Sequence, residues 1–171
     1  MVKKMGLFKR LKDGNRIKLC NKKHVITDTE AGFEYEIDTA FRQTRSNAME
    51  VEALSIYVSD GKENKQNDVP CVMVLTDPVI YEAIETYKEK GISGDETTCL
   101  EPLKDQFLYR AVTEYYGDML YYYAFEKEKR GHKEKLGLCL EYPMEYAKTN
   151  DERVLKGVLD EVADSFKVIN L

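Results

Sequence analysis

The sequence has no tryptophan, four prolines and only two histidines among 171 residues. The histidines, His24 and His132, are far apart, and the chain has no HExxH motif, Gly-rich phosphate loop, GxSxG turn or EF-hand loop. No nucleophile is therefore paired with a base by any recognisable spacing. We expect a protein that is not an enzyme and that needs no cofactor and no metal.

Cysteine is also scarce, and its spacing lacks the CxxC pairs of zinc sites and redox motifs. The four cysteines are Cys20, Cys71, Cys99 and Cys139, each in or beside an apolar run. We expect buried free thiols in a reducing compartment, because the alternative of two structural disulfides requires secretion. The start, MVKKMGLFKRLKDG, has no apolar segment of signal-peptide length, and no later stretch approaches the ~20 apolar residues of a membrane span. These absences favour a cytoplasmic protein.

Charge is distributed unevenly along the chain. Residues 1–23 contain nine Lys or Arg side chains and one acid, which gives a net charge of +8. The whole chain has 26 basic and 31 acidic side chains, so residues 24–171 carry −13. We therefore expect a basic N-terminal arm, residues 1–23, followed by a single domain, residues 24–171, with one hydrophobic core. An acidic domain is a poor ligand for nucleic acid and suits a basic protein partner.

The basic arm has its own apolar pattern. Apolar residues recur at three- and four-residue steps, at Val2, Met5, Phe8 and Leu11, with lysines between them. This spacing favours a short amphipathic helix. Basic side chains beside an apolar stripe suit anionic lipid headgroups, so the arm is a candidate for docking on a membrane surface. The alternative is a lysine-rich terminal helix that packs on its own domain.

From His24 onward, most of the chain alternates apolar and polar residues, which is typical of strands. We expect strands over residues 24–27, 33–37, 50–58, 69–75, 97–100 and 134–142. A long hairpin is predicted from two aromatic-rich runs, 106–116 and 119–127, around Gly117-Asp118. Glycine in the first turn position supplies the positive φ of a type II′ turn. The dense apolar run at 69–75 predicts a central strand that is covered on both faces.

Two stretches have the helical period instead. One covers residues 78–90 and begins with Pro78, which suits a first turn. The other covers residues 151–166, has Thr149 or Asn150 as a candidate N-cap, and carries an apolar stripe of Val154, Leu155, Val158, Leu159, Val162 and Phe166. Together these elements predict an α+β domain in which helices pack on an antiparallel β-sheet.

Paired acids on strands are the first candidates for a binding site. Glu34 and Glu36 lie on one strand face, and Glu50 and Glu52 repeat this spacing on another. Paired carboxylates can perform acid–base chemistry or bind cations. The alternative is the solvated face of an amphipathic strand.

Tyrosines are the second candidates, since seven of the twelve lie between positions 109 and 142. On the predicted hairpin, Tyr116 and Tyr122 point to the face opposite Tyr115, Tyr121 and Tyr123. If one face is core, the other presents phenols, which suit protein interfaces. The alternative is a set of cross-strand aromatic pairs that stabilise the sheet.

The order of the elements, together with two short segments, resembles the PsbP-like superfamily, which includes the DcrB-type bacterial proteins. The segment with Gly32, Phe33, Tyr35 and Ile37 matches a Gly-Phe-x-φ-x-φ pattern in an early strand pair, where φ is apolar, and Ser165-Phe166 matches the end of a C-terminal helix. The resemblance covers about residues 24–168. It implies an αβα sandwich around an antiparallel sheet, used to bind proteins, with no catalytic residues to carry over.

These observations lead to two hypotheses of function. The first is a non-enzymatic protein-binding domain, in its most concrete form a bacterial toxin-neutralising immunity protein, because neutralising a basic toxin needs only complementary charge and shape. Its predicted contact residues are Glu34, Glu36, Glu50, Glu52, Tyr116 and Tyr122. The second is a membrane-surface accessory protein that docks through residues 1–23.

Overall fold

The computed structural model describes residues 19–29, 31–43, 53–59, 70–75, 99–103, 106–115 and 117–169. The elements in these ranges are β1 (Lys23–Asp28), β2 (Phe33–Asp38), β3 (Phe41–Gln43), β4 (Ala53–Ser59), β5 (Cys71–Leu75), β6 (Cys99–Pro102), β7 (Phe107–Tyr115), β8 (Asp118–Lys129), β9 (His132–Pro143), the 3-10 helix η1 (Met144–Tyr146), α3 (Asn150–Ser165) and β10 (Lys167–Val168). The predicted helix over 78–90 and the predicted arm helix lie outside the described residues.

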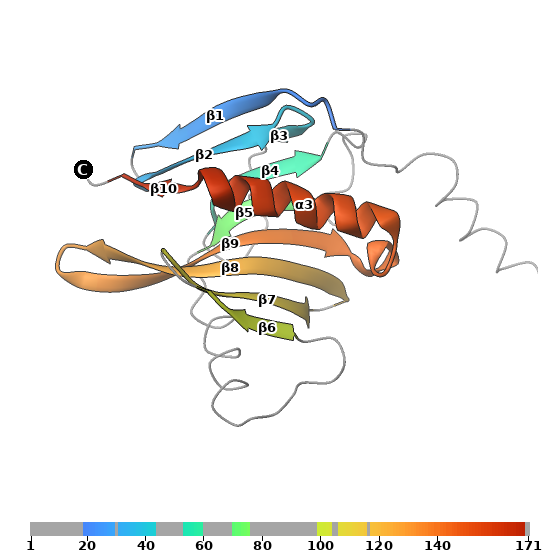
Figure 1. Ribbon diagram of the computed structural model, residues 1–171. Coiled ribbons are helices and arrows are strands. Elements are labelled where there is room, and N and C mark those ends of the chain that lie inside the picture. Colours follow the sequence, from blue (N-terminus) through green and yellow to red (C-terminus); the bar gives the residue numbers. More distant parts are fainter. Residues whose placement is uncertain are drawn as a thin grey trace, which may run out of the picture.

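The strands form two antiparallel sheets. A three-stranded sheet has the order β1-β2-β10, and a seven-stranded sheet has the order β3-β4-β5-β9-β8-β7-β6. Two residues connect β2 to β3, so the chain passes directly from the small sheet into the large one. Helix α3 lies between the small sheet and strands β8 and β9 of the large sheet (Figure 1). The predicted α+β class with antiparallel strands is confirmed.

Helix α3 forms where the apolar period predicted it. Thr149 is its N-cap, since the side-chain oxygen accepts the N–H of Glu152 at 3.2 Å. The buried side of the helix consists of Leu155, Val158, Leu159, Val162 and Ala163. Phe166 follows the helix and packs against Phe125 with ring centroids 4.9 Å apart. Val154 was predicted to belong to the apolar stripe, but it is 38% exposed because it lies at the solvent edge of that stripe.

The predicted hairpin is present, with its turn one residue earlier than expected. Tyr115 pairs with Asp118, so Gly117, with φ 87°, occupies the second turn position and not the first. A second hairpin joins β8 to β9 through Arg130 and Gly131, whose φ angles are 52° and 79°. Positive φ at both positions is typical of a type I′ turn. The sequence suggested a longer connection because the strand ends are charged and have no apolar alternation.

In strands β5 and β8 of the large sheet, buried side chains lie on both faces. The face toward α3 belongs to a core that also includes Phe33, Tyr35 and Ile37 of β2. The opposite face carries a second cluster of Cys71, Met73, Leu75, Tyr109, Ala111, Leu120, Tyr122, Ala124 and Cys139. Every residue of β5 is buried, as predicted for a central strand.

Asp38 organises the beginning of the domain. It is only 7% exposed, and its carboxylate accepts the N–H groups of Cys20 (2.9 Å), Asn21 (2.9 Å) and Ala40 (2.8 Å). The C=O of Lys22 accepts the N–H of Thr39 at 2.8 Å. Residues 20–22 are therefore hydrogen-bonded to the end of β2 and the turn after it.

The thiols are only partly as predicted. Cys71 and Cys139 are buried, but Cys20 is exposed because it precedes β1 on the surface. Among the residues that the structure describes, no helix is both long and apolar enough to cross a membrane.

Candidate protein-binding surface

Strand β2 has one apolar and one acidic face. Phe33, Tyr35 and Ile37 point into the core and are at most 1% exposed. Glu34 and Glu36 alternate with them and point outward; Glu36 is exposed and Glu34 is half-buried. Period-two alternation thus places both carboxylates on the outer face of the small sheet.

Strand β1 lies beside these acids. Val25 pairs with Glu36, and Thr27 pairs with Glu34. The hydroxyl of Thr27 donates to Glu34 Oε2 at 3.1 Å. Val25 is 58% exposed, so the outer face presents an apolar side chain next to a carboxylate.

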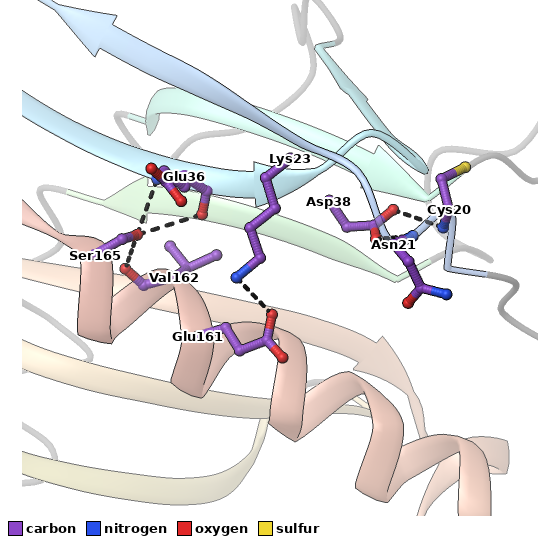
Figure 2. Close-up of polar contacts among 8 residues, drawn as sticks. All are labelled: Cys20, Asn21, Lys23, Glu36, Asp38, Glu161, Val162 and Ser165. Carbon is purple, nitrogen blue, oxygen red and sulfur yellow. Dashed lines mark hydrogen bonds and ion pairs between the residues drawn. The ribbon is translucent and has the colours of Figure 1, made fainter.

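Helix α3 is fastened to β2 at Glu36. Strand β10 pairs only with Phe33 and Glu34. Beyond it, the hydroxyl of Ser165 accepts the N–H of Glu36 at 2.9 Å and donates to the C=O of Val162 at 2.9 Å (Figure 2). Ser165 thus replaces a strand partner for β2 and holds the end of α3 against the small sheet.

A lysine lies among carboxylates at this junction. Lys23 Nζ is 2.9 Å from Glu161 Oε2 of α3 (Figure 2). This hydrogen-bonded ion pair raises the pKa of Lys23, and the nearby charges of Glu36 and Asp38 act in the same direction. Glu161 is exposed, and so is Asp164 one turn further along α3. We call Glu34, Glu36, Glu161 and Asp164 the acidic surface.

The other predicted contact residues have different outcomes. Glu50, Glu52 and Tyr116 lie outside the described residues. The prediction that Tyr122 is an exposed phenol is wrong, because it is 2% exposed. Its strand, β8, is in the interior of the large sheet, and residues 119–125 of that strand are buried on both faces. The Tyr122 ring packs edge-to-face against Tyr109 of β7 with centroids 6.2 Å apart, as in the alternative of cross-strand aromatic pairs.

Two tyrosines of β8 bind one carboxylate of α3. The hydroxyls of Tyr121 and Tyr123 donate to Asp160 Oδ1 at 2.7 and 2.6 Å. Arg110 Nη1 lies 3.7 Å from the same oxygen. Burial, together with the hydrogen bond to Asp160, raises the pKa of both phenols, so they remain protonated donors at neutral pH.

A third tyrosine makes the same kind of hydrogen bond to a carboxylate in the first turn of α3. Tyr142 of β9 donates to Glu152 Oε1 at 2.6 Å, and Lys156 Nζ lies 3.2 Å from that oxygen. Burial raises the pKa of Glu152, but the bonds from Tyr142, the Lys148 N–H and Lys156 outweigh this, and the net pKa is lowered. We call Tyr121, Tyr123, Tyr142, Glu152 and Asp160 the helix–sheet seam. The seam was not predicted from the sequence. The sequence feature that could have indicated it is a pair of acids on a helix predicted to pack on a tyrosine-rich sheet.

A partly buried pair of acids, Glu141 and Asp118, lies at one end of the second sheet face. Glu141 is directly opposite Cys71. Burial, with the charge of Asp118, raises the pKa of Glu141 to about 7. Burial also raises the pKa of the Cys71 thiol, so a nucleophilic thiolate does not form at neutral pH. The described ranges hold no group of three His, Cys, Asp or Glu side chains arranged to bind a metal.

Comparison with known proteins gives a distant structural likeness. No protein-family model matches the chain, and no curated protein matches it. Among solved structures, the chain is similar to the cyanobacterial PsbP (CyanoP) from Synechocystis sp. PCC 6803, with a TM-score of 0.40 and 13% identity over 85% of this chain and 92% of that one.

Proposed function

We propose that the protein is a non-enzymatic protein-binding domain and that its acidic surface receives a basic protein. The supporting observation is that Glu36 and Asp164 are exposed and make no side-chain hydrogen bond or ion pair with the described part of the chain. Carboxylates that the fold does not use remain available for a partner. The exposed Val25 beside Glu36 adds the apolar contact that the centre of an interface needs.

The concrete form of this proposal is an immunity protein that neutralises a basic toxin. Neutralisation requires tight association by complementary charge and shape, and no catalytic group. The charge of −13 on residues 24–171 would accelerate the approach of a basic toxin by long-range attraction. Such association weakens with added salt, because salt screens exposed charges.

The test is a titration of the purified chain with the product of the neighbouring gene, at low and moderate salt. We expect the double variant Glu34→Lys/Glu36→Lys to weaken binding by about 10-fold or more, because it places like charges in the interface. The control, Glu114→Lys/Glu128→Lys, makes the same change in net charge on exposed acids of β7 and β8. We expect it to weaken binding by no more than about 3-fold. An equal loss in both variants would mean that only net charge is recognised, and the proposed surface would be wrong.

The membrane hypothesis predicts a different result. Deletion of residues 1–18 would abolish sedimentation with vesicles that contain an anionic lipid, and it would leave the acidic surface unchanged. Vesicle binding that depends on the arm, together with no affinity for any basic protein tested, would overturn the immunity proposal in favour of membrane docking.

A further inference from the structure

Strand β1 is the outermost strand of the small sheet, and half of its backbone groups point away from β2. The N–H of Glu36 goes to Ser165, on the side away from β1. The N–H of Thr39 goes to Lys22, on the side of β1. Because hydrogen-bonded and non-bonded pairs alternate in an antiparallel ladder, Lys23, Val25 and Thr27 direct their N–H and C=O groups to the open edge. Within the described ranges, no residue pairs with these groups.

The centre of this edge has none of the usual protection. Edge strands are commonly blocked by proline, a bulge or a lysine that faces the open side. Strand β1 has no proline, its register with β2 is continuous, and its lysine at the start, Lys23, is held by Glu161 of α3. The residue in the middle of the strand is Val25, which is 58% exposed.

The sequence of this edge is complementary to itself. If two copies of β1 run antiparallel about a two-fold axis at Val25, then Val25 is opposite its own copy and His24 is opposite Ile26. At the ends, Lys22 is opposite Asp28, so opposite charges meet twice. Because the backbone groups of Val25 point to the open edge, the central pair is hydrogen-bonded in this register.

We propose that β1 pairs with β1 of a second copy of the chain, centred on Val25, so that two small sheets form one continuous six-stranded sheet. The pairing uses the strand edge and leaves the outward carboxylates of Glu34 and Glu36 exposed. It shares Val25, but neither carboxylate, with the surface of the proposed function. In the dimer, the two acidic surfaces lie on the same side of the continuous sheet, because the two-fold axis is perpendicular to it. The contact is small, so the dimer dissociates on dilution through the micromolar range.

Disulfide trapping tests the register directly. All variants are made in the background Cys20→Ser, which removes an exposed thiol. Two Val25→Cys chains would have Cα atoms about 5.5 Å apart, within the range of a disulfide. Two Lys23→Cys chains would have Cα atoms about 14 Å apart, because the residue opposite Lys23 is Thr27 of the other copy. On mild oxidation, we expect Val25→Cys to form a disulfide-linked dimer rapidly and Lys23→Cys to form none. A mixture of Lys23→Cys and Thr27→Cys should again form a disulfide-linked dimer. The register is contradicted if Lys23→Cys alone is trapped as fast as Val25→Cys. It is also contradicted if neither variant is trapped.

Sedimentation velocity tests the association itself. The parent chain should shift from monomer toward dimer as concentration rises, and Val25→Lys should shift the dissociation constant upward by about 10-fold or more, since it places two like charges in direct contact. Val154→Lys is the matched control, because Val154 is an exposed valine on α3; it should leave the dissociation constant unchanged.

A parent chain that stays monomeric at all concentrations overturns the proposal. If that monomer loses a basic partner on Val25→Lys but keeps it on Val154→Lys, Val25 belongs to the proposed interface with the basic protein and not to a dimer contact. If Glu34→Lys/Glu36→Lys loses the basic partner but still dimerises, the acidic surface binds the partner and the β1 edge forms the dimer.

Discussion

The helix–sheet seam and the acidic surface contain the same kind of side chain in opposite situations. In the seam, Asp160 receives two tyrosine hydroxyls and Glu152 receives one, so both carboxylates are part of the contact between α3 and the large sheet. On the acidic surface, Glu36 and Asp164 have no side-chain partner in the described part of the chain. The comparison separates acids that stabilise the fold from acids that are available for binding.

Asp38 shows that position on a strand does not decide between these situations. It follows Glu34 and Glu36 at the same two-residue spacing, yet it is buried and holds three backbone N–H groups. The difference arises because residues 20–21 and the turn after β2 fold around its carboxylate. An acid becomes structural where the backbone supplies donors that have no other partner.

The largest effect is expected for Asp38→Ala. The substitution leaves three N–H groups without their acceptor, and we expect the free energy of unfolding to fall by about 3 kcal/mol. Urea unfolding followed by circular dichroism measures this. The control Glu36→Ala, on the same strand, should change the free energy of unfolding by less than about 0.5 kcal/mol. Similar losses in the two variants would show that the outer carboxylates also stabilise the fold, and the comparison would fail.

The next effect concerns the seam. Asp160→Ala removes the acceptor of Tyr121 and Tyr123, and we expect a loss of about 1–2 kcal/mol in the free energy of unfolding, since both hydroxyls are partly buried. Asp164→Ala makes the same substitution one turn further along α3, at an exposed site. It should be neutral within about 0.5 kcal/mol. The seam is not a stabilising contact if the two variants unfold at the same urea concentration.

The partly buried pair of Glu141 and Asp118 predicts a stability that falls as pH rises. The native state keeps a proton on Glu141 up to a pKa of about 7, whereas the unfolded chain releases it near the ordinary value of 4.5. Between these values the native state binds more protons, so the free energy of unfolding decreases with increasing pH. Asp118→Asn removes the neighbouring charge and should lower the pKa of Glu141 and flatten this dependence. Carbon-13 titration of the Glu141 carboxyl group checks the pKa, and a value unchanged by Asp118→Asn would contradict the coupling.

Local pattern predicted much of the fold and only part of the site. The apolar stripe of α3, the Thr149 cap and the alternation of β2 depend on residues a few positions apart, so they can be read from the sequence. Tyr121 and Tyr123 are 39 and 37 residues from Asp160, and Asp38 is 18 residues from Cys20. Such contacts depend on how the elements pack. The burial of Tyr122 was missed for the same reason, since alternation distinguishes two faces but does not show that both are covered.

The smallest effect should come from removing a single charge in the seam. The pKa of Glu152 is lowered in the native state by the bonds from Tyr142 and Lys156, against the effect of burial. Its contribution to stability is therefore complete above the ordinary pKa of the unfolded chain and disappears as pH falls through the lower native value. Glu152→Gln keeps an oxygen that accepts from Tyr142, so we expect a loss below about 1 kcal/mol at pH 7 and no loss in acid. Glu36→Gln should be neutral at both pH values. If Glu152→Gln instead lowers the urea midpoint equally at pH 7 and in acid, the contribution of Glu152 lies in its shape and hydrogen bonds, and its charge does not distinguish the seam from the acidic surface.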